Sequence, residues 1–303
     1  MMKRNFMALL RAKWDEEKFV CVGLDPDIAK IPDCLCKASA VDKITAFNYA
    51  ILDATKDIAG VYKLNSAFYE AEGMDGLDAL RQTIVDIHTY APSVPIILDA
   101  KRADIGNTNA GYVQSAFEYL NADAITVHPY LGAEALQPFL DCADKGIIVL
   151  CRTSNKGAGE FQDRHVFVDQ EEYDFLTQVE ADVRDDAGIV HITRLFKHVA
   201  YQVGHEWNKN GNCLLVVGAT YPDELRDVRR IVGDMPILIP GIGAQGGDVE
   251  KTVLAGKDSR GHGMIINSSR GIIYASNGPD FAEAARAETF KLHNLINHYR
   301  KGE

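Results

Sequence analysis

The sequence predicts a (β/α)8 barrel, in which eight parallel strands alternate with helices and close into a cylinder. Three observations favour this fold. Short apolar runs rich in Val, Ile and Leu recur eight times along the 303 residues. Continuous runs of this kind are typical of parallel strands that are buried on both faces. The segments between them carry apolar residues at helical spacing, and no low-complexity stretch or linker divides the chain.

The predicted elements follow one another in regular order. The eight strands occupy residues 19–25, 60–65, 95–101, 123–128, 146–152, 213–218, 236–241 and 263–269. The segment before the first strand is typical of an amphipathic helix and not of a signal peptide, because its apolar run breaks at Arg11 and no small-residue cleavage site follows. Ile44, Phe47 and Ile51 have helical spacing after the first strand, and residues 279–300 are expected to form the last barrel helix. An open, doubly wound sheet is the alternative arrangement of the same elements.

One interval departs from the regular spacing. The fifth and sixth strands are roughly 60 residues apart, about twice the usual length of a unit. The excess is an acidic segment, 157–189, which holds ten Asp or Glu against two Arg, a local charge of −8. It contains a short apolar run at 166–168 and a helical pattern around Leu176. We interpret it as an insertion at the rim of a single barrel domain that spans residues 1–303.

The composition argues against several classes of function. A net charge of −11 argues against nucleic acid and anionic membranes as partners. No apolar run approaches the ~20 residues of a membrane-spanning helix. The six cysteines form no CxxC pair, which argues against a zinc or redox site, and three of them lie inside predicted strands. We therefore expect a cytoplasmic protein with reduced thiols and no metal.

Polar side chains gather where the predicted strands end. Asp25 closes the first strand, Lys63 and Asn65 the second, and Asp99 and Lys101 the third. Residues two apart on a strand share a face, so Asp99 and Lys101 are expected to point the same way. In a (β/α)8 barrel the carboxyl ends of the strands form the face on which catalytic groups collect. The fifth and eighth strands also end in polar residues, at Arg152 and Asn267. The alternative is that each of these is a solvated loop residue, but polar ends on five of the eight strands favour a functional site.

Two loops near the C-terminus predict an anion site. The segment 240-PGIGAQGGD-248 follows the seventh strand and starts a helix, and 267-NSSRG-271 follows the eighth strand and supplies Arg270. Glycines let backbone N–H groups approach an anion, and the start of a helix adds partial positive charge. Loops after strands seven and eight are the usual phosphate site of such barrels. The string GIGAQG also fits the dinucleotide pattern GxGxxG, but that pattern belongs to the first strand–helix turn of its fold.

The most specific stretch is 98-LDAKRADIGNT-108, which places Asp99, Lys101 and Asp104 in a D-x-K-x-x-D motif. Together with 23-GLDPD-27, KLN at 63–65, HPYLG at 128–132 and the two glycine-containing loops, it resembles the orotidine 5′-phosphate decarboxylase family, in its longer branch. The resemblance implies a homodimeric (β/α)8 barrel. It also implies the conversion of orotidine 5′-phosphate (OMP) to UMP and CO2 in pyrimidine biosynthesis, without a metal or an organic cofactor.

The resemblance assigns roles residue by residue. The catalytic network would consist of Lys63, Asp99, Lys101 and Asp104, with Lys101 protonating C6 of the pyrimidine. Asp104 and Thr108 would reach into the site of the other subunit. For substrate binding, the resemblance assigns Asp25 and Asn65 to the ribose, Thr153 and Ser154 to the base, and Gln245 and Arg270, with Gly243 and Gly271 of their loops, to the phosphate.

These charges suit the chemistry. Loss of CO2 leaves a carbanion at C6 with no adjacent carbonyl group to take up its charge, so preorganised electrostatics must stabilise it. An ammonium flanked by carboxylates is favoured in its charged form and can act as the acid. Two Lys and two Asp sum to zero charge, and a hydrogen-bonded network is the form in which such groups can be buried.

Two other functions remain as alternatives. A metal-dependent sugar-phosphate decarboxylase or synthase of the same superfamily shares the D-x-K-x-x-D motif, but it places an acidic metal ligand at the end of the second strand. Here that position is Lys63, which would repel Mg²⁺. A non-catalytic phosphate-binding barrel would need the glycine loops and Arg270 but not the charged network. A separate orotate phosphoribosyltransferase is a candidate protein partner.

Overall fold

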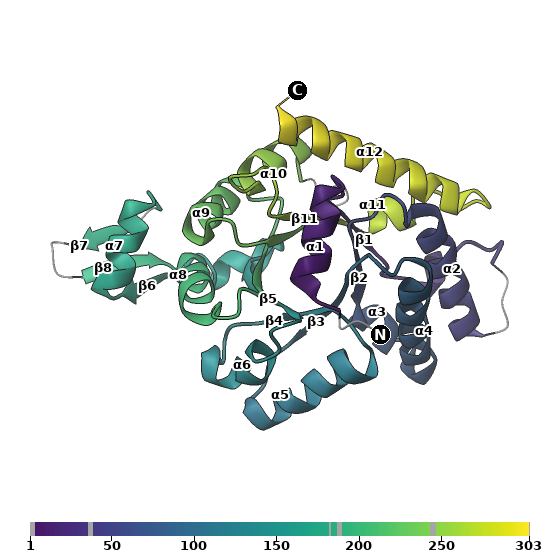
Figure 1. Cartoon of the computed structure of the whole chain (residues 1–303), viewed down its shortest axis with the longest axis horizontal. Coiled ribbons are helices and arrows are strands. Elements are labelled where there is room, and N and C mark those ends of the chain that lie inside the picture. The colour runs from purple at the N-terminus through teal and green to yellow at the C-terminus, as the bar shows by residue number, and fades with distance from the viewer. Residues whose placement is uncertain (1–3, 36–38, 182, 187–189, 243–246, 303) are drawn as a thin grey trace.

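The computed structural model describes residues 4–35, 39–181, 183–186, 190–242 and 247–302. Its centre is a closed barrel of parallel strands in the order β1-β2-β3-β4-β5-β9-β10-β11 (Figure 1). These strands are β1 (Val20–Gly23), β2 (Val61–Asn65), β3 (Ile96–Arg102), β4 (Ala124–Val127), β5 (Gly146–Arg152), β9 (Cys213–Val217), β10 (Ile237–Pro240) and β11 (Met264–Ser268). Each matches a strand predicted from the sequence to within a few residues, and the (β/α)8 prediction is confirmed.

Pairing between the first and last strands excludes the open sheet. β11 pairs in parallel with β1, with Val20 opposite Ile266 and Val22 opposite Ser268. On its other side β1 pairs with β2, where Gly23 lies opposite Lys63. The barrel therefore closes, and the doubly wound alternative is wrong. Closure brings the carboxyl ends of all its strands to one rim, which is where the polar side chains of the sequence fall.

Helices cover the outside of the barrel (Figure 1). They are α2 (Ala40–Thr55), α3 (Ser66–Glu70), α4 (Gly73–Tyr90), α5 (Gly106–Val113), α6 (Gly132–Leu140), α8 (Leu195–Tyr201), α9 (Pro222–Val232), α10 (Val249–Gly256), α11 (Arg270–Ile273) and α12 (Phe281–Lys301). α5 and α8 each continue into a π-helical segment, Gln114–Tyr119 and Gln202–Trp207. The last barrel helix predicted at 279–300 is confirmed as α12.

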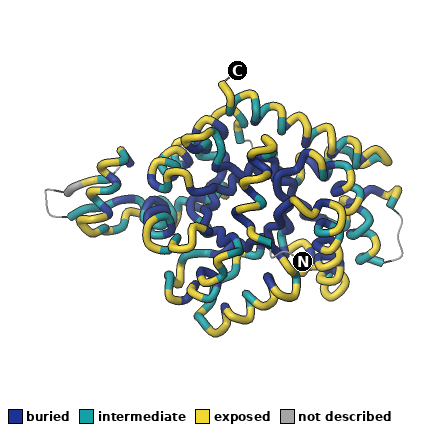
Figure 2. The backbone as a smooth tube through the Cα atoms, viewed as in Figure 1, coloured by how far each residue is buried: buried dark blue, intermediate teal, exposed yellow. Residues whose placement is uncertain are grey.

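The core lies between the barrel and these helices, as the dark blue centre of Figure 2 shows. Ile44, Phe47 and Ile51 form the buried face of α2, as their spacing predicts. Burying each such side chain contributes about 1.5–3 kcal/mol to folding. Ser39 begins the helix by accepting a hydrogen bond from the backbone N–H of Asp42.

A short helix, α1 (Phe6–Asp15), lies at the end of the barrel where the strands begin. The backbone N–H of Phe6 donates to the carbonyl of Asp144, just before β5, and the Phe6 ring lies against Gly146. The indole N–H of Trp14 donates to the carbonyl of Met264, the first residue of β11, at 2.9 Å. The predicted amphipathic helix therefore covers the amino end of the barrel and leaves the carboxyl end open to ligands.

The segment between β5 and α8 carries a second sheet, at the left of Figure 1. It contains β6 (His165–Val168), α7 (Gln170–Gln178), β7 (Arg184–Asp186) and β8 (Val190–Arg194), and the antiparallel order is β6-β8-β7. The apolar run at 166–168 falls in β6, and Leu176 is buried in α7, as predicted. Because β8 pairs with β6 as far as Arg194, the segment extends beyond the predicted boundary at 189. We use the name insertion for residues 157–194.

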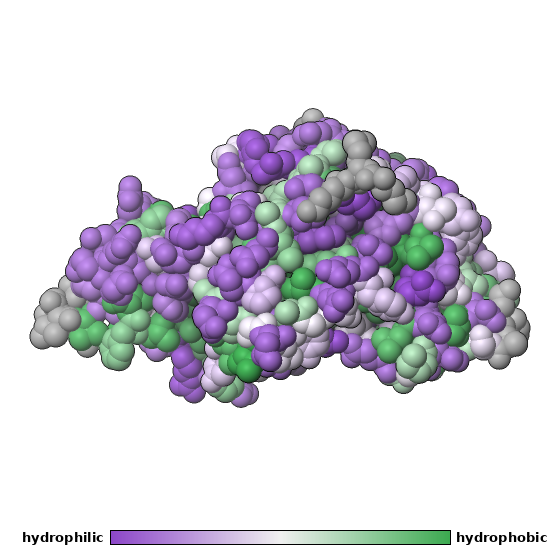
Figure 3. Space-filling view, turned by 60° about the horizontal axis from the view of Figure 1, so that its bottom comes forward, coloured by the Kyte–Doolittle hydropathy of each residue, from purple (hydrophilic) through white to green (hydrophobic). Residues whose placement is uncertain are grey.

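Hydrophilic residues dominate the face drawn in Figure 3, and hydrophobic residues occur there in separate patches. No helix among the described residues combines the length and the apolar character needed to cross a membrane. Cys21, Cys151 and Cys213 are buried free thiols, as their positions inside apolar strands predict.

Candidate active site

A cavity of about 630 Å³ opens at the carboxyl ends of the barrel strands. Eight of the predicted site residues line it, namely Asp25, Lys63, Asn65, Asp99, Lys101, Thr153, Ser154 and Arg270. They come from the ends of β1, β2, β3, β5 and β11 or from the turns that follow these strands. The volume is in the range of pockets that hold a small organic ligand.

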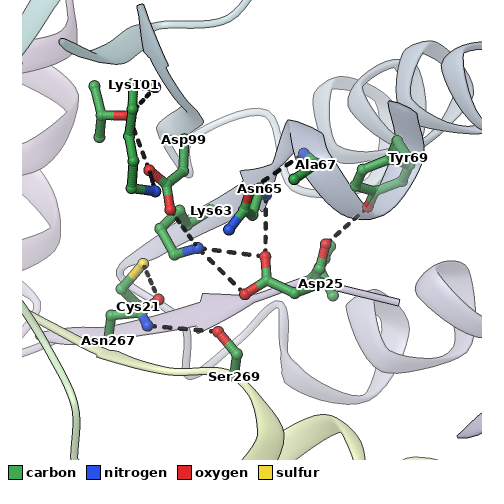
Figure 4. Close-up of polar contacts among 12 residues, drawn as sticks. Cys21, Asp25, Lys63, Asn65, Ala67, Tyr69, Asp99, Lys101, Asn267 and Ser269 are labelled. Carbon is green, nitrogen blue, oxygen red and sulfur yellow. Dashed lines mark hydrogen bonds and ion pairs between the residues drawn. The ribbon is translucent and has the colours of Figure 1, made fainter. Parts of the chain in front are cut away.

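A row of alternating charges crosses one wall of the cavity (Figure 4). The Lys101 Nζ lies 2.7 Å from Oδ1 of Asp99, and the other oxygen of Asp99 lies 3.2 Å from Nζ of Lys63. Lys63 Nζ in turn lies 3.3 Å from both carboxylate oxygens of Asp25. The row therefore contains two ammonium groups and two carboxylates, and its formal charge is zero.

Burial is unequal along this row. The side chains of Lys63, Asp25 and Asp99 are 5%, 10% and 12% exposed, whereas that of Lys101 is 47% exposed. Lys101 is thus the end of the row that is most open to a ligand. Its ammonium is held by the buried carboxylate of Asp99, which is paired in turn with Lys63 and, through Lys63, with Asp25.

The pKa values of the two central groups keep both of them charged. Burial alone would raise the pKa of Asp99, but the ammonium groups of Lys63 and Lys101 outweigh it and hold that pKa well below its ordinary value. Burial alone would lower the pKa of Lys63, but the carboxylates of Asp25 and Asp99 outweigh it and raise the pKa above its ordinary value. Each charge is therefore sustained by its neighbours, as a buried ionic network requires.

The backbone of β3 is irregular where it presents Lys101. The pairing of β3 with β4 shifts register between Leu98 and Arg102, and Lys101 adopts a left-handed conformation with φ of +48°. Such a conformation costs of order 1–3 kcal/mol in a non-glycine residue and is common at functional sites. Asp99 and Lys101 were expected to point the same way as residues two apart on a regular strand. Their side chains do meet, at 2.7 Å, but through this irregular backbone and not through regular strand alternation.

Thr126 of β4 holds this irregular segment. Its hydroxyl donates to Oδ1 of Asp99 at 2.8 Å and accepts from the backbone N–H of Lys101 at 2.9 Å. Thr126 was not predicted as a site residue, because one hydroxyl inside the apolar run AITV carries no distinctive signal. Its position beside Asp99 becomes visible only when β3 and β4 are paired.

Asp25, which the family resemblance assigns to the ribose, is also part of the polar network within the protein. Besides Lys63, its Oδ1 accepts a hydrogen bond from the backbone N–H of Asn65 at 3.0 Å. The Tyr274 hydroxyl accepts from the backbone N–H of Asp27 at 2.6 Å and donates to the Asp25 carbonyl at 3.4 Å. Burial raises the pKa of Tyr274 to about 12, so this hydroxyl keeps its proton. Tyr274 is a second contributor that sequence reasoning missed.

The remaining predicted residues lie elsewhere. Asp104 and Thr108 lie on the β3–α5 loop and in α5, and neither is among the residues that line the cavity of this chain. The backbone N–H of Ile105 donates to Oδ1 of Asp104 at 2.6 Å. Gly271 is exposed in α11, beside Arg270 but outside the cavity lining. Gln245 and Gly243 fall outside the described residues.

The cavity also has apolar lining residues. Leu150 of β5, Val216 of β9 and Leu238 of β10, three successive strands of the barrel, line the cavity. Arg270 begins α11 and its side chain is exposed at the rim. A ligand in the cavity would therefore have both cations, Lys101 and Arg270, and apolar side chains available to it. This distribution suits an anionic molecule with a flat apolar centre.

A metal ion is poorly suited to this site. Asp25 and Asp99 are the carboxylates that line the cavity at the charged row, and both face the ammonium of Lys63. A divalent cation placed between them would have to displace that ammonium or be repelled by it. Among the described residues, no group of three His, Cys, Asp or Glu side chains is arranged to hold a metal ion.

Comparison with known proteins gives a consistent result. Residues 18–287 match the model of the "Orotidine 5'-phosphate decarboxylase / HUMPS" family. Orotidine 5'-phosphate decarboxylase from Cellvibrio japonicus is 45% identical over 97% of this chain and 98% of the relative. The structure of Leishmania donovani OMP decarboxylase superposes with a TM-score of 0.79 at 34% identity and covers 98% of this chain and 99% of that one. Leishmania donovani UMP synthase superposes with a TM-score of 0.80 at 35% identity, and this chain spans 57% of its length.

Proposed function

Because the chain belongs to the orotidine 5′-phosphate decarboxylase / HUMPS family, we propose that it is a carboxy-lyase that converts OMP to UMP and CO2 in pyrimidine biosynthesis. The position of Lys63 is the observation that favours this decarboxylase over the metal-dependent enzymes of the same superfamily. Its ammonium lies between Asp25 and Asp99, where the metal-dependent sugar-phosphate enzymes of the superfamily would need an acidic ligand. The site therefore supports charge stabilisation by side chains.

The chemical step follows from the exposed end of the charged row. When the bond between C6 and the carboxylate breaks, its electron pair stays on C6 and CO2 leaves. The Lys101 ammonium stabilises this developing charge and then transfers a proton to C6, and the neutral amine regains a proton from water. Asp99 holds Lys101 at 2.7 Å and fixes its direction. Lys63 and Lys101 keep Asp99 ionised, and Asp25 pairs with the other side of the Lys63 ammonium.

Substrate binding is proposed to use the other predicted residues. Arg270, together with Gln245 and the glycines of the two loops, holds the phosphate. Thr153 and Ser154 contact the base on the opposite side of the cavity, and Asp25 and Asn65 lie beside the ribose. Binding energy from the phosphate, remote from C6, can then be used to orient the ring at Lys101.

A homodimer is part of the proposal. Neither Asp104 nor Thr108 lines the cavity of this chain, which supports a role for them in the cavity of a second copy. Large apolar side chains on the same loop and on the adjoining β4–α6 loop are exposed, with Ile105 at 60% and Tyr130 at 84%. Such a patch supports burial against a second copy. Sedimentation of the purified chain as a dimer is the expected result.

The proposal also includes a protein partner and a cellular location. A separate orotate phosphoribosyltransferase, which would supply the substrate, is the candidate protein partner, and co-purification of the two tests it. Buried free thiols at Cys21, Cys151 and Cys213 are in keeping with a reducing compartment, so we propose a cytoplasmic location.

The decisive experiment is an activity assay on the purified chain. OMP should be consumed, with loss of its characteristic ultraviolet absorbance and formation of UMP, at the same rate with and without EDTA. A rate that EDTA abolishes would favour the metal-dependent alternative. Tight binding of UMP without turnover of OMP would favour the non-catalytic phosphate-binding barrel.

A further inference from the structure

The turn after β5, residues 153–155, lines the same cavity as the charged row. We call it the base turn, because the proposed function assigns Thr153 and Ser154 to the pyrimidine. A loop that recognises a flat ring must hold its polar atoms within a fraction of an ångström of the productive geometry. The residues that hold this turn are therefore of interest, and they come from the insertion.

Gln162 of the insertion binds the base turn through both ends of its amide. Its Oε1 accepts from the backbone N–H of Thr153 at 2.8 Å, and its Nε2 donates to the Thr153 hydroxyl at 2.9 Å. That hydroxyl then donates to Oδ1 of Asn155 at 2.7 Å. The three groups form one directed chain of hydrogen bonds, and Gln162 itself lines the cavity beside the turn.

The next residue of the insertion holds the other side of the turn. Asp163 accepts from Nε and Nη2 of Arg152 at 2.9 and 3.0 Å. The Arg152 side chain is 3% exposed, lies over the Tyr221 ring at 4.0 Å and donates through Nη1 to the Thr153 carbonyl at 2.8 Å. A bidentate, buried guanidinium of this kind is a strong and specific contact.

Residues of the barrel hold Gln162 and the base turn in turn. The backbone N–H of Phe196, in α8, donates to the Gln162 carbonyl at 3.0 Å. On the far side, a Cβ atom added to Gly218 would meet backbone and Cβ atoms of Ser154 at 2.6–2.8 Å. The base turn therefore packs against Gly218, directly after β9, on one side and is held by Gln162 and Asp163 on the other.

We propose that Gln162 and Asp163 are positioning residues that hold the base turn in the shape that receives the pyrimidine, so that the insertion sets affinity for the base of the nucleotide. This inference rests on the proposed function and adds to it. It gives the insertion a direct connection to the active site through two neighbouring side chains.

The test compares two inhibitors of OMP turnover in wild-type and variant proteins. UMP carries the base, whereas ribose 5-phosphate has the same sugar and phosphate without it. Gln162→Ala should raise the inhibition constant of UMP about tenfold, the effect of losing one to two hydrogen bonds. The constant for ribose 5-phosphate should stay within twofold of wild type, and the loss in kcat/KM for OMP should arise mainly from KM.

Two variants control the comparison. Gln162→Glu keeps an acceptor for the Thr153 N–H and should recover most of the UMP affinity. Gln170→Ala removes the same kind of side chain from an exposed position of the insertion, where it donates to Asp174, and should leave both constants unchanged. If Gln162→Ala fails to fold, Gln162→Met fills the same space without hydrogen bonds and takes its place in the comparison.

The outcomes separate this inference from the proposed function. Equal loss of affinity for both inhibitors would mean that Gln162 only supports the fold, and no loss for either would mean that the base turn does not need it. Either result overturns the inference while wild-type turnover of OMP still stands. Failure of the wild-type protein to decarboxylate OMP would instead overturn the proposed function.

Discussion

Replacement of Lys63 by methionine removes the ammonium from the centre of the charged row and keeps most of the apolar stem. Lys63 lies 3.2 Å from Asp99 and 3.3 Å from Asp25, and each contact is worth about 5 kcal/mol at an effective dielectric of about 20. Desolvation of the buried charges offsets much of this attraction. Removing Lys63 leaves the buried carboxylate of Asp25 without its ammonium partner and that of Asp99 with Lys101 alone. Lys63→Met should therefore lower the free energy of unfolding by about 3–5 kcal/mol at neutral pH.

The same variant should show a characteristic dependence on pH. In the wild-type protein the pKa of Asp99 is held below its ordinary value, so its contribution to stability is present above the unfolded-state pKa of about 4 and is lost as the pH falls through the folded-state value. In Lys63→Met, burial remains and one of the opposing ammonium groups is gone, so the pKa of Asp99 should rise. The deficit in stability should therefore be largest near pH 7 and become smaller as the pH falls below about 5.

Urea unfolding followed by circular dichroism between pH 4 and pH 8 measures this effect. Lys291→Met, which removes an exposed lysine paired with Glu288 on α12, is the matched control and should unfold as the wild-type protein does at every pH. A Lys63→Met variant as stable as wild type at pH 7, or one whose deficit does not change with pH, would refute the argument that the row is a mutually sustained ionic network.

Three other predictions concern turnover. Lys101→Ala should fold and bind UMP but lose at least about a thousandfold in kcat, because it removes both the acid and the nearest cation; substantial remaining activity would exclude its central role. Arg270→Ala should lower kcat/KM for OMP strongly, with an unchanged circular dichroism spectrum; unchanged turnover would show that the phosphate lies elsewhere. If Asp104 serves the neighbouring subunit, mixing inactive Lys101→Ala and Asp104→Ala proteins should restore up to about a quarter of wild-type activity, since half of randomly mixed dimers have one intact site. A mixture that stays inactive after verified subunit exchange would place Asp104 outside the site.

Much of the fold was predictable because parallel barrel strands are buried on both faces. Each of the barrel strands therefore appears as a continuous apolar run, and the ends of those runs locate Lys63, Asp99 and Lys101. Closure of the barrel was harder to predict. What separates a barrel from an open sheet is the pairing of β1 with β11, and the sequence does not show which strands pair. The boundary of the insertion was also missed, since β8 has no continuous apolar run and forms by pairing with β6.

The parts of the site that could not be predicted depend on contacts between strands. Asp25 becomes a partner of Lys63 because β1 and β2 are neighbours and Gly23 lies opposite Lys63. Thr126 supports Lys101 because β3 changes register beside β4. Neither relation has a spacing along the chain that could be read from the sequence. The left-handed backbone of Lys101 is likewise a local conformation that tertiary contacts stabilise against the preference of a lysine.

The central claim is that the charged row at the mouth of the barrel removes CO2 from OMP with its own side chains and protonates C6. Turnover of OMP by the purified protein in D2O, in the presence of EDTA, tests it most directly. We expect UMP that carries one deuterium at C6, formed at the rate measured without EDTA. UMP without deuterium at C6, or no UMP when EDTA is present, would contradict the account.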